Sequence, residues 1–144
     1  MRLFSQDTKA QALKGVPLFE DLSRKELVQL ERVCEDLEVE QGRVLCKEGE
    51  VGHEFFVLVN GKVQVSRKGR RVATMGGGDF VGGIALVTKL PRTATVTAET
   101  PVRLFVLTSR EFHAVLDRNP KVERKVLRAL ARRLAETSSD PTLA

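Results

Sequence analysis

The sequence predicts a mainly β protein with flanking helices: an antiparallel β-roll or jelly-roll barrel between an N-terminal helix and C-terminal helices. Two observations carry this prediction. Ten of the 11 glycines lie between Gly42 and Gly83, where tight turns should gather. Apolar residues alternate with period two in that middle region and recur at helical spacing on either side of it. A length of 144 residues suits one domain with its own core.

The N-terminal segment, residues 1–36, is expected to be helical. Ser23-Arg24-Lys25-Glu26 fits a capping box, and Leu22 and Leu27 are placed as a hydrophobic staple. A shorter helix is expected over Thr8–Lys14. Helical spacing after Ser23 is kept by five apolar positions, namely Leu27, Leu30, Val33, Cys34 and Leu37.

The middle segment, residues 37–108, is expected to form the β-roll. Asn60-Gly61 and Lys68-Gly69 are dipeptides that accept the positive φ of tight hairpin turns, so each predicts a hairpin. The predicted strands are Val44–Cys46, Phe55–Val59, Val63–Val65, Val72–Met75, Ala94–Ala98 and Val102–Thr108.

The C-terminal segment, residues 109–137, is expected to be helical again. Thr108-Ser109-Arg110-Glu111 is a second capping box, and Asn119-Pro120 starts a further helix with proline in its first position. Ser138–Pro141 should end that helix, leaving residues 138–144 as a tail, so that residues 1–144 make a single domain. One side of the helix is predicted to be apolar through Val122, Val126, Leu127, Leu130 and Leu134.

Composition excludes several classes of protein. No apolar run approaches the ~20 residues of a membrane helix, and the first 15 residues lack a secretory signal, so we expect a cytoplasmic protein. Cys34 and Cys46 lack metal-site spacing and are expected to be free thiols. His53 and His113 stand 60 positions apart, and no catalytic triad or metal-ligand cluster is evident. We therefore expect no enzyme activity and no cofactor.

The formal charge of +5 is a local property of one helix. Residues 121–133 hold six basic side chains against Glu123, and the remaining residues balance. A basic helix alone would bind DNA weakly and without sequence preference, so nucleic acid is not an expected partner. A solvated surface is the simplest interpretation of a second basic cluster on a predicted hairpin, formed by Lys62, Arg67, Lys68, Arg70 and Arg71.

The chemically informative segment is residues 76–96, GGGDFVGGIALVTKLPRTATV. Gly82 and Gly83 leave room for a ligand to approach the backbone. A helical turn from Gly83 to Leu86 would direct unpaired N–H groups at an anion. Arg92 could pair bidentately with a phosphate, and Thr93 adds a hydroxyl group beside it.

Residues 80–86, FVGGIAL, and 91–96, PRTATV, resemble the phosphate-binding cassette of cyclic nucleotide-binding domains, whose pattern is approximately F-x-G-E-[IL]-A-L followed by P-R-[TSA]-A-[TS]. The resemblance extends over roughly residues 18–134. It implies cyclic AMP or cyclic GMP as the ligand. The cyclic phosphate would be bound by Arg92, with phosphate and ribose cradled by the backbone of Gly82, Ile84 and Ala85. The resemblance assigns Thr93 to phosphate contact or to guanine-versus-adenine preference, and the helix from Pro120 to a lid or dimerisation role.

Gly83 departs from the family pattern, which has a glutamate that accepts a hydrogen bond from the ribose 2′-hydroxyl. Losing a hydrogen bond to a charged group, worth about 1.5–3 kcal/mol, would weaken binding roughly 10–100-fold. We therefore expect weakened binding at a site that still includes Gly83. An altered ligand, a degenerate site and an introduced substitution are alternatives, and so is an ordinary surface glycine.

The leading hypothesis is a non-enzymatic cyclic-nucleotide sensor that signals through its C-terminal helix and forms a homodimer through residues 120–136. One alternative is the sensor domain of a catabolite-activator-type transcription regulator, because residues 126–136 resemble the helix that joins its two domains. Only residues 137–144 follow here, too few for a helix-turn-helix. The other alternative is a protein-interaction module with a vestigial pocket.

Overall fold

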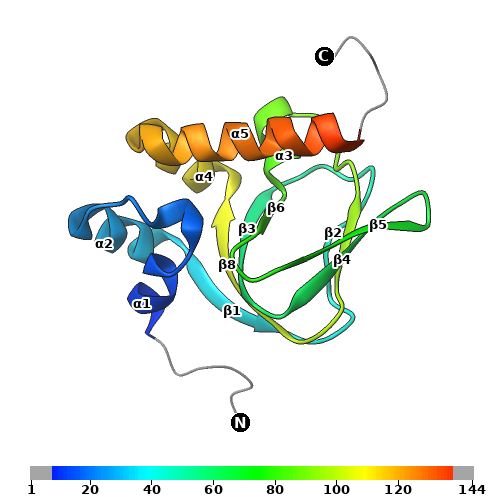
Figure 1. Cartoon of the computed structure of the whole chain (residues 1–144), viewed down its shortest axis with the longest axis horizontal. Helices are drawn as coiled ribbons and strands as arrows, with labels where there is room; N and C mark the ends of the chain where they lie inside the picture. Colours follow the sequence, from blue (N-terminus) through cyan, green and yellow to red (C-terminus); the bar gives the residue numbers. More distant parts are fainter. Residues whose placement is uncertain (1–7, 138–144) are drawn as a thin grey trace.

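Two four-stranded antiparallel sheets form a β-roll between helices in the computed structural model, which describes residues 8–137 (Figure 1). The first sheet has the order β1-β8-β3-β6 and the second the order β2-β7-β4-β5. The strands are β1 (Glu35–Val39), β2 (Val44–Cys46), β3 (Glu54–Asn60), β4 (Lys62–Arg67), β5 (Arg70–Gly76), β6 (Phe80–Val81), β7 (Thr95–Ala98) and β8 (Val102–Thr108). The predicted fold class is confirmed.

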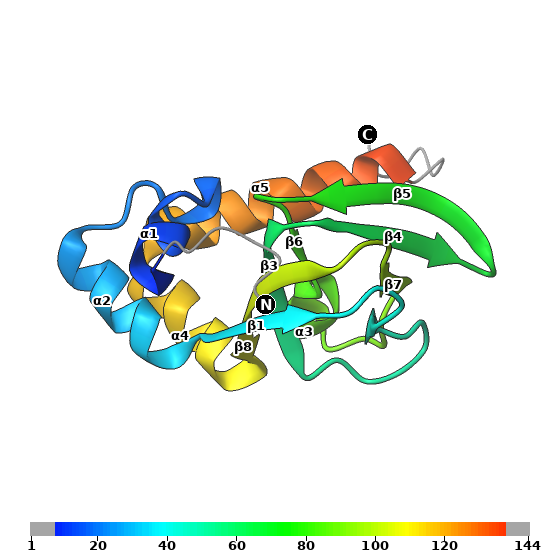
Figure 2. The same cartoon turned by 90° about the horizontal axis from the view of Figure 1, so that it is seen from below.

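The helices gather at one end and along one side of the roll (Figures 1 and 2). They are α1 (Lys9–Lys14), the 3-10 turn η1 (Pro17–Phe19), α2 (Arg24–Val33), α3 (Gly83–Thr88), α4 (Ser109–Arg118) and α5 (Pro120–Thr137). Both predicted capping boxes are present, at Ser23 with Glu26 and at Thr108 with Glu111. Because side chains satisfy the first N–H groups of these helices, their start points follow from local sequence.

One prediction about local structure is wrong. Asn60-Gly61 does not close a hairpin, because β3 belongs to the first sheet and β4 to the second. Gly61 has the expected positive φ of 92°, but the turn carries the chain from one sheet to the other. Leu37 lies in β1 opposite Leu104 of β8, within the segment predicted to form the β-roll, and β1 begins at Glu35. The predicted hairpin at Lys68-Gly69 is confirmed, with β4 paired to β5. The predicted tail, residues 138–144, lies outside the described residues.

The core consists of two apolar clusters, one on each face of the first sheet. The outer cluster joins β3, β8 and the helices, and in it the ring of Phe55 stacks on that of Phe112 with centroids 4.4 Å apart. The inner cluster fills the roll with strand residues such as Leu58 and Val63. At the edge of the first sheet, Arg103 donates two hydrogen bonds to the Asp36 carboxylate, at 3.1 and 2.9 Å.

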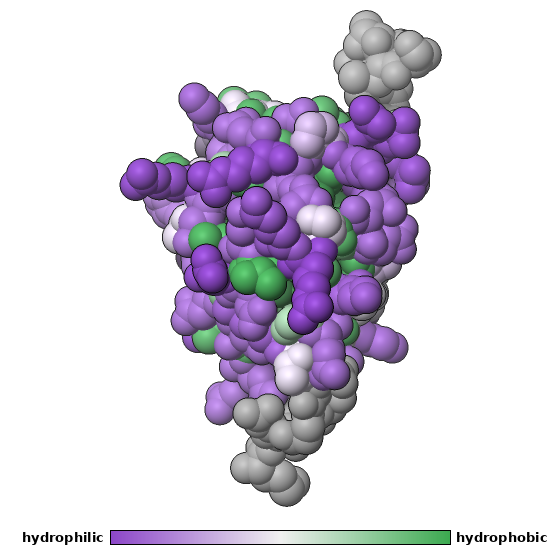
Figure 3. Space-filling model, turned by 90° about the vertical axis from the view of Figure 1, so that its left-hand side faces the viewer, coloured by the Kyte–Doolittle hydropathy of each residue, from purple (hydrophilic) through white to green (hydrophobic). Residues whose placement is uncertain are grey.

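Helix α5 crosses the roll beside α3 (Figure 1). Of the apolar side chains of α5, Val122, Val126 and Leu130 are buried, as predicted. Leu127 and Leu134 are exposed and contribute little to the core. The face of the molecule at the N-terminal helices, on the left in Figure 1, has a mostly hydrophilic surface with small separate apolar areas (Figure 3).

We predict that Phe112→Ala lowers the free energy of unfolding by about 3–5 kcal/mol, because its ring is 1% exposed and joins α4 to β3. Chemical denaturation would measure the loss. Val51→Ala, at a side chain that is 70% exposed, is the control and should change stability by less than about 0.5 kcal/mol. Equal losses in the two variants would contradict this account of the core.

Candidate ligand-binding site

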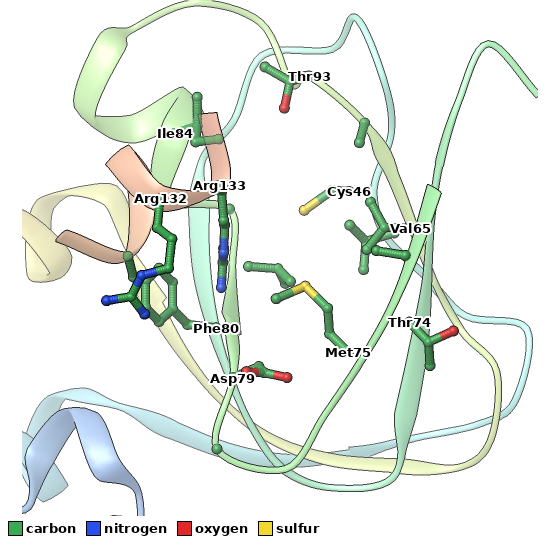
Figure 4. Close-up of a pocket in the computed structure, with 18 of the residues that line it drawn as sticks. Cys46, Val65, Thr74, Met75, Asp79, Phe80, Ile84, Thr93, Arg132 and Arg133 are labelled. Carbon is green, nitrogen blue, oxygen red and sulfur yellow. The ribbon is translucent and has the colours of Figure 1, made fainter. Parts of the chain in front are cut away.

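A pocket of about 900 Å³, called here the main pocket, is lined by the second sheet, η1, residues 77–85 and 92–94, and α5. All six predicted site residues line it or form its edge. Gly82, Gly83, Ile84 and Ala85 lie where β6 passes into α3, and Arg92 and Thr93 lie just before β7. The hydroxyl of Thr93 points toward the cavity (Figure 4).

Arg92 is the best-fixed side chain of the site. It is 8% exposed, and its guanidinium donates to the carbonyl oxygen of Gly82 at 2.8 Å and to that of Glu54 at 2.7 Å. Its backbone is held as well, because its N–H donates to the Glu50 carbonyl oxygen and its own carbonyl accepts from Gly49. A guanidinium has more N–H donors than these two side-chain bonds use.

The charge of Arg92 has no counter-ion in the part of the chain that the structure describes. Its guanidinium bonds two neutral carbonyl oxygens, and no ion pair with an aspartate or glutamate is formed within residues 8–137. Burying a cation away from water costs free energy unless an opposite charge compensates it. An anion bound next to Arg92 would therefore be electrostatically favoured.

Two glycines are required by the position of Arg92. A Cβ at Gly52 would lie 2.8 Å from Cζ of Arg92, closer than unbonded carbon atoms approach. Gly82 has a φ of 95°, and a Cβ there would lie 2.7 Å from Nη1 of Arg92. The predicted helical turn follows directly, since α3 begins at Gly83. Its first N–H groups consequently lie next to the guanidinium that binds Gly82.

Gly83 is buried, so its interpretation as an ordinary surface glycine is wrong. A Cβ at this position would lie 3.5 Å from a methyl group of Leu130 and 3.5 Å from the ring of Phe55, which are ordinary packing distances. The backbone therefore has space for a side chain at residue 83, but that side chain would contact α5. Gly83 thus lies where the cassette packs against the C-terminal helix.

Helix α5 supplies a second arginine that the sequence interpretation missed. Cζ of Arg133 lies 4.3 Å from the centroid of the Phe80 ring, and Figure 4 shows the side chain extending along the cavity. Burial lowers the pKa of Arg133, and the carboxylates of Asp79 and Glu136 oppose that shift. Cation–π contact and partial burial distinguish this residue from the solvated cations of the same helix.

The opposite wall of the pocket belongs to the second sheet, where Cys46, Val65 and Met75 face the cavity (Figure 4). Cys46 and Cys34 are free and buried, as predicted. Burial raises the pKa of the Cys46 thiol and raises that of Cys34 to about 11, so both thiols stay protonated near neutral pH.

Arg67 also lines the main pocket, which corrects its assignment to a solvated face of the hairpin. Strand alternation could have found it, because Arg67 follows Val63 and Val65 at spacing two and shares their inward face. The neighbouring Arg70 and Arg71 are exposed, so the prediction holds for them.

Within residues 8–137, histidine, cysteine and acidic side chains form no group suited to a metal ion. Over the same residues, no helix is long and apolar enough to cross a membrane.

Comparison with known proteins identifies the architecture. Residues 36–119 match the family model described as "Cyclic nucleotide-binding domain". The chain belongs to this family. The matched range contains both parts of the cassette, so the family resemblance inferred from those residues is confirmed.

The chain is similar to parts of several longer proteins. A cyclic nucleotide-gated potassium channel of Rhizobium etli is 36% identical over 85% of this chain and 35% of its own length. A cAMP-dependent protein kinase regulatory subunit of Yarrowia lipolytica is 38% identical over 72% of this chain and 28% of its own. The catabolite activator protein of Thermus thermophilus superposes with a TM-score of 0.73 at 27% identity, covering 83% of this chain and 59% of its own. This chain thus spans about a third of the two sequence relatives.

We predict that Gly52→Ala displaces the Arg92 guanidinium, because the added carbon would lie 2.8 Å from Cζ of Arg92 and 3.0 Å from Cβ of Ala85. The Nε–H resonance of Arg92 should shift in NMR spectra, and the melting temperature should fall by several degrees. Gly15→Ala is the control, since its nearest contacts would be 3.6 Å or more. An unmoved Arg92 resonance in Gly52→Ala would contradict the packing described above.

Proposed function

We propose that this domain is a regulatory module that binds a 3′,5′-cyclic nucleotide, cyclic AMP or cyclic GMP, in the main pocket. The observation that carries the proposal is the buried guanidinium of Arg92, which lacks a carboxylate partner within residues 8–137 and lies at the start of α3. The relatives support the same ligand class, because they are a cyclic nucleotide-gated channel and a cAMP-dependent kinase subunit.

In this proposal the cyclic phosphate accepts hydrogen bonds from Arg92 and from the first N–H groups of α3, in the backbone of Ile84 and Ala85. The ribose would lie beside the backbone of Gly82 and Gly83, which line the main pocket. Thr93 contributes its hydroxyl at the same end of the pocket. The base then extends along the apolar wall that includes Val65 of the second sheet.

The signal is proposed to leave through α5. Leu130 of this helix packs beside Gly83, so a ligand that orders the cassette also changes the surface on which α5 rests. The helix is tied to the N-terminal segment through Lys125, whose Nζ lies 2.9 Å from the Pro17 carbonyl oxygen and 2.9 Å from the Asp21 carboxylate. A shift of α5 would therefore reach η1 as well.

Several further assignments belong to this proposal. The chain is taken as a single domain, non-enzymatic and without a cofactor, and its location as cytoplasmic. A homodimer through residues 120–136 would use the exposed side chains of Leu127 and Leu134. Nucleic acid is not a proposed partner.

Isothermal titration calorimetry with cyclic AMP and cyclic GMP tests the function directly. We predict that Arg92→Ala weakens binding by roughly 100-fold or more, since a charge-assisted, buried interaction with phosphate is lost. Arg110→Ala, which removes an exposed arginine outside the main pocket, should leave the affinity unchanged. Because Arg92 also holds two carbonyl groups, melting curves must show that the variant is folded. Unchanged binding by folded Arg92→Ala would remove this residue from the site.

We predict that Gly83→Glu tightens binding of a ribonucleotide by roughly 10–100-fold, because a carboxylate here would accept a hydrogen bond from the 2′-hydroxyl. The space around Gly83 accommodates the first side-chain carbon without a clash. Affinity for the 2′-deoxy analogue of the same cyclic nucleotide should not increase.

Gly83→Ala is the matched control, since it adds the carbon without the carboxylate and should leave the ratio of ribose to deoxyribose affinity near one. Absence of heat at millimolar cyclic nucleotide, both in the natural chain and in Gly83→Glu, would overturn the proposed function.

A further inference from the structure

The two longest edge strands of the β-roll are β1 and β5. Each pairs with a neighbour on one side only, β1 with β8 and β5 with β4. The other two edge strands, β2 and β6, have three and two residues, so they offer little backbone to a further strand. β1 has five residues and β5 has seven. Along such an edge, alternate N–H and C=O groups point outward, where a strand of another molecule can bind them.

Both strands are exposed over most of their length. In β5 the first five residues are exposed, including Val72, which is 50% exposed. In β1 the first four residues are exposed, including Leu37, which is 36% exposed. Because successive side chains point to opposite faces, these runs leave both faces of each strand open. The β4–β5 hairpin projects from the roll at the end away from the N-terminal helices, whereas β1 starts just after α2 (Figures 1 and 2).

The two strands differ in the sign of their charge. Residues 35–40, EDLEVE, hold four carboxylates and no cation. Residues 67–71, RKGRR, hold four cations and no carboxylate. Like charges placed directly opposite each other destabilise a strand pair, and opposite charges stabilise it. The acidic strand and the basic hairpin are therefore complementary in charge.

Local ion pairs neutralise only one group on each strand. Asp36 pairs with Arg103 at 2.9 Å, and Arg71 pairs with Glu99 at 2.7 Å. Four exposed charges of the two segments form no ion pair within residues 8–137, namely Glu35, Glu38, Lys68 and Arg70. These charges are available to a strand from another molecule.

Charge also decides which edges of two copies can meet. Two copies of β5 would place cations opposite cations, and two copies of β1 would place carboxylates opposite carboxylates, so like edges repel each other. β1 against β5 places opposite charges across the junction, and Leu37 and Val72 supply an apolar residue on each side. Such a junction would join the first sheet of one copy to the second sheet of the next in a continuous sheet of eight strands.

We propose that β5 is a docking edge for β1 of a second copy of this domain, joined by strand addition. The contact is heterologous, because each copy uses β5 toward one neighbour and β1 toward the other. Association through it is consequently open-ended and does not close at a dimer. The inference is independent of the proposed function, and its two edges lie outside α5, the helix of the proposed homodimer.

Sedimentation velocity of the chain without nucleotide tests the inference. Species larger than a dimer should grow with protein concentration. Raising the salt from about 0.1 M to about 1 M should weaken assembly, because the charges are screened. Two double variants reverse the charge of one edge each, Lys68→Glu with Arg70→Glu on the hairpin and Glu35→Lys with Glu38→Lys on β1. Each should raise the concentration needed for assembly by about tenfold or more.

Mixing the two double variants provides a rescue. The hairpin variant has two acidic edges and the β1 variant has two basic edges, so neither assembles alone, but an equal mixture again presents opposite charges at each junction. The mixture should assemble at about the concentration that the natural chain needs. Arg110→Glu with Arg118→Glu is the matched control, because it makes the same change in net charge at exposed residues of α4 and should leave assembly unchanged. Melting curves establish that each variant is folded, and a single reversal, Arg70→Glu or Glu35→Lys, replaces a double variant that does not fold.

Three outcomes would overturn the inference. The first is a natural chain that stays monomeric at millimolar concentration in low salt, which would leave β5 to a partner other than this domain. The second is assembly that neither edge reversal weakens, since another surface, such as α5, would then hold the copies together. The third is a mixture of the two double variants that fails to assemble. None of these measurements involves a nucleotide, so the proposed function is tested separately.

Discussion

The buried guanidinium of Arg92 is the interaction on which the arrangement of the site depends. It bonds carbonyl groups at the start of β3 and before α3, and its backbone bonds the turn at residues 49 and 50. Residues 49–54 and Gly82 are thereby brought together around one cation. The same contacts exclude side chains at Gly52 and Gly82, so these glycines are required by proximity to Arg92. A buried charge held only by neutral oxygens is costly on its own, so an anion bound beside it would offset that cost.

The position of α5 follows from the position of α3. Because Gly82 turns the chain in the left-handed region, α3 begins against β3 and presents Gly83 to Leu130. A Cβ at position 83 would make ordinary contacts with Leu130 of α5 and with the ring of Phe55, and Arg133 contacts the ring of Phe80 farther along α5. A substitution at residue 83 would therefore alter the contact between the cassette and the C-terminal helix as well as any contact with a ligand.

Local sequence predicted the features that local interactions decide. The capping boxes at Ser23 and Thr108 start helices where expected, and the two-part cassette brings all six predicted residues to one pocket. The errors lie where distant partners decide. Asn60-Gly61 adopts the turn conformation expected for a hairpin. However, β3 pairs with β8 and β6 on its two sides, so the next strand, β4, joins the second sheet. The helical segment is predicted to reach residue 36, yet pairing of Glu35 with Val106 starts β1 at residue 35. The spacing of apolar residues along the chain does not indicate which distant strand a segment will pair with.

The arginines of the main pocket differ in how firmly they are held, and this difference suits them to different tasks. Arg92 is fixed by side-chain and backbone hydrogen bonds, so it can orient an anion without further ordering. Arg133 belongs to α5. Its cation–π contact with the ring of Phe80 is a weak interaction that would break if the helix moved. Arg67 sits at the end of β4, next to a hairpin turn. In the proposed function, anion binding and signalling would therefore depend on separate elements that share the main pocket.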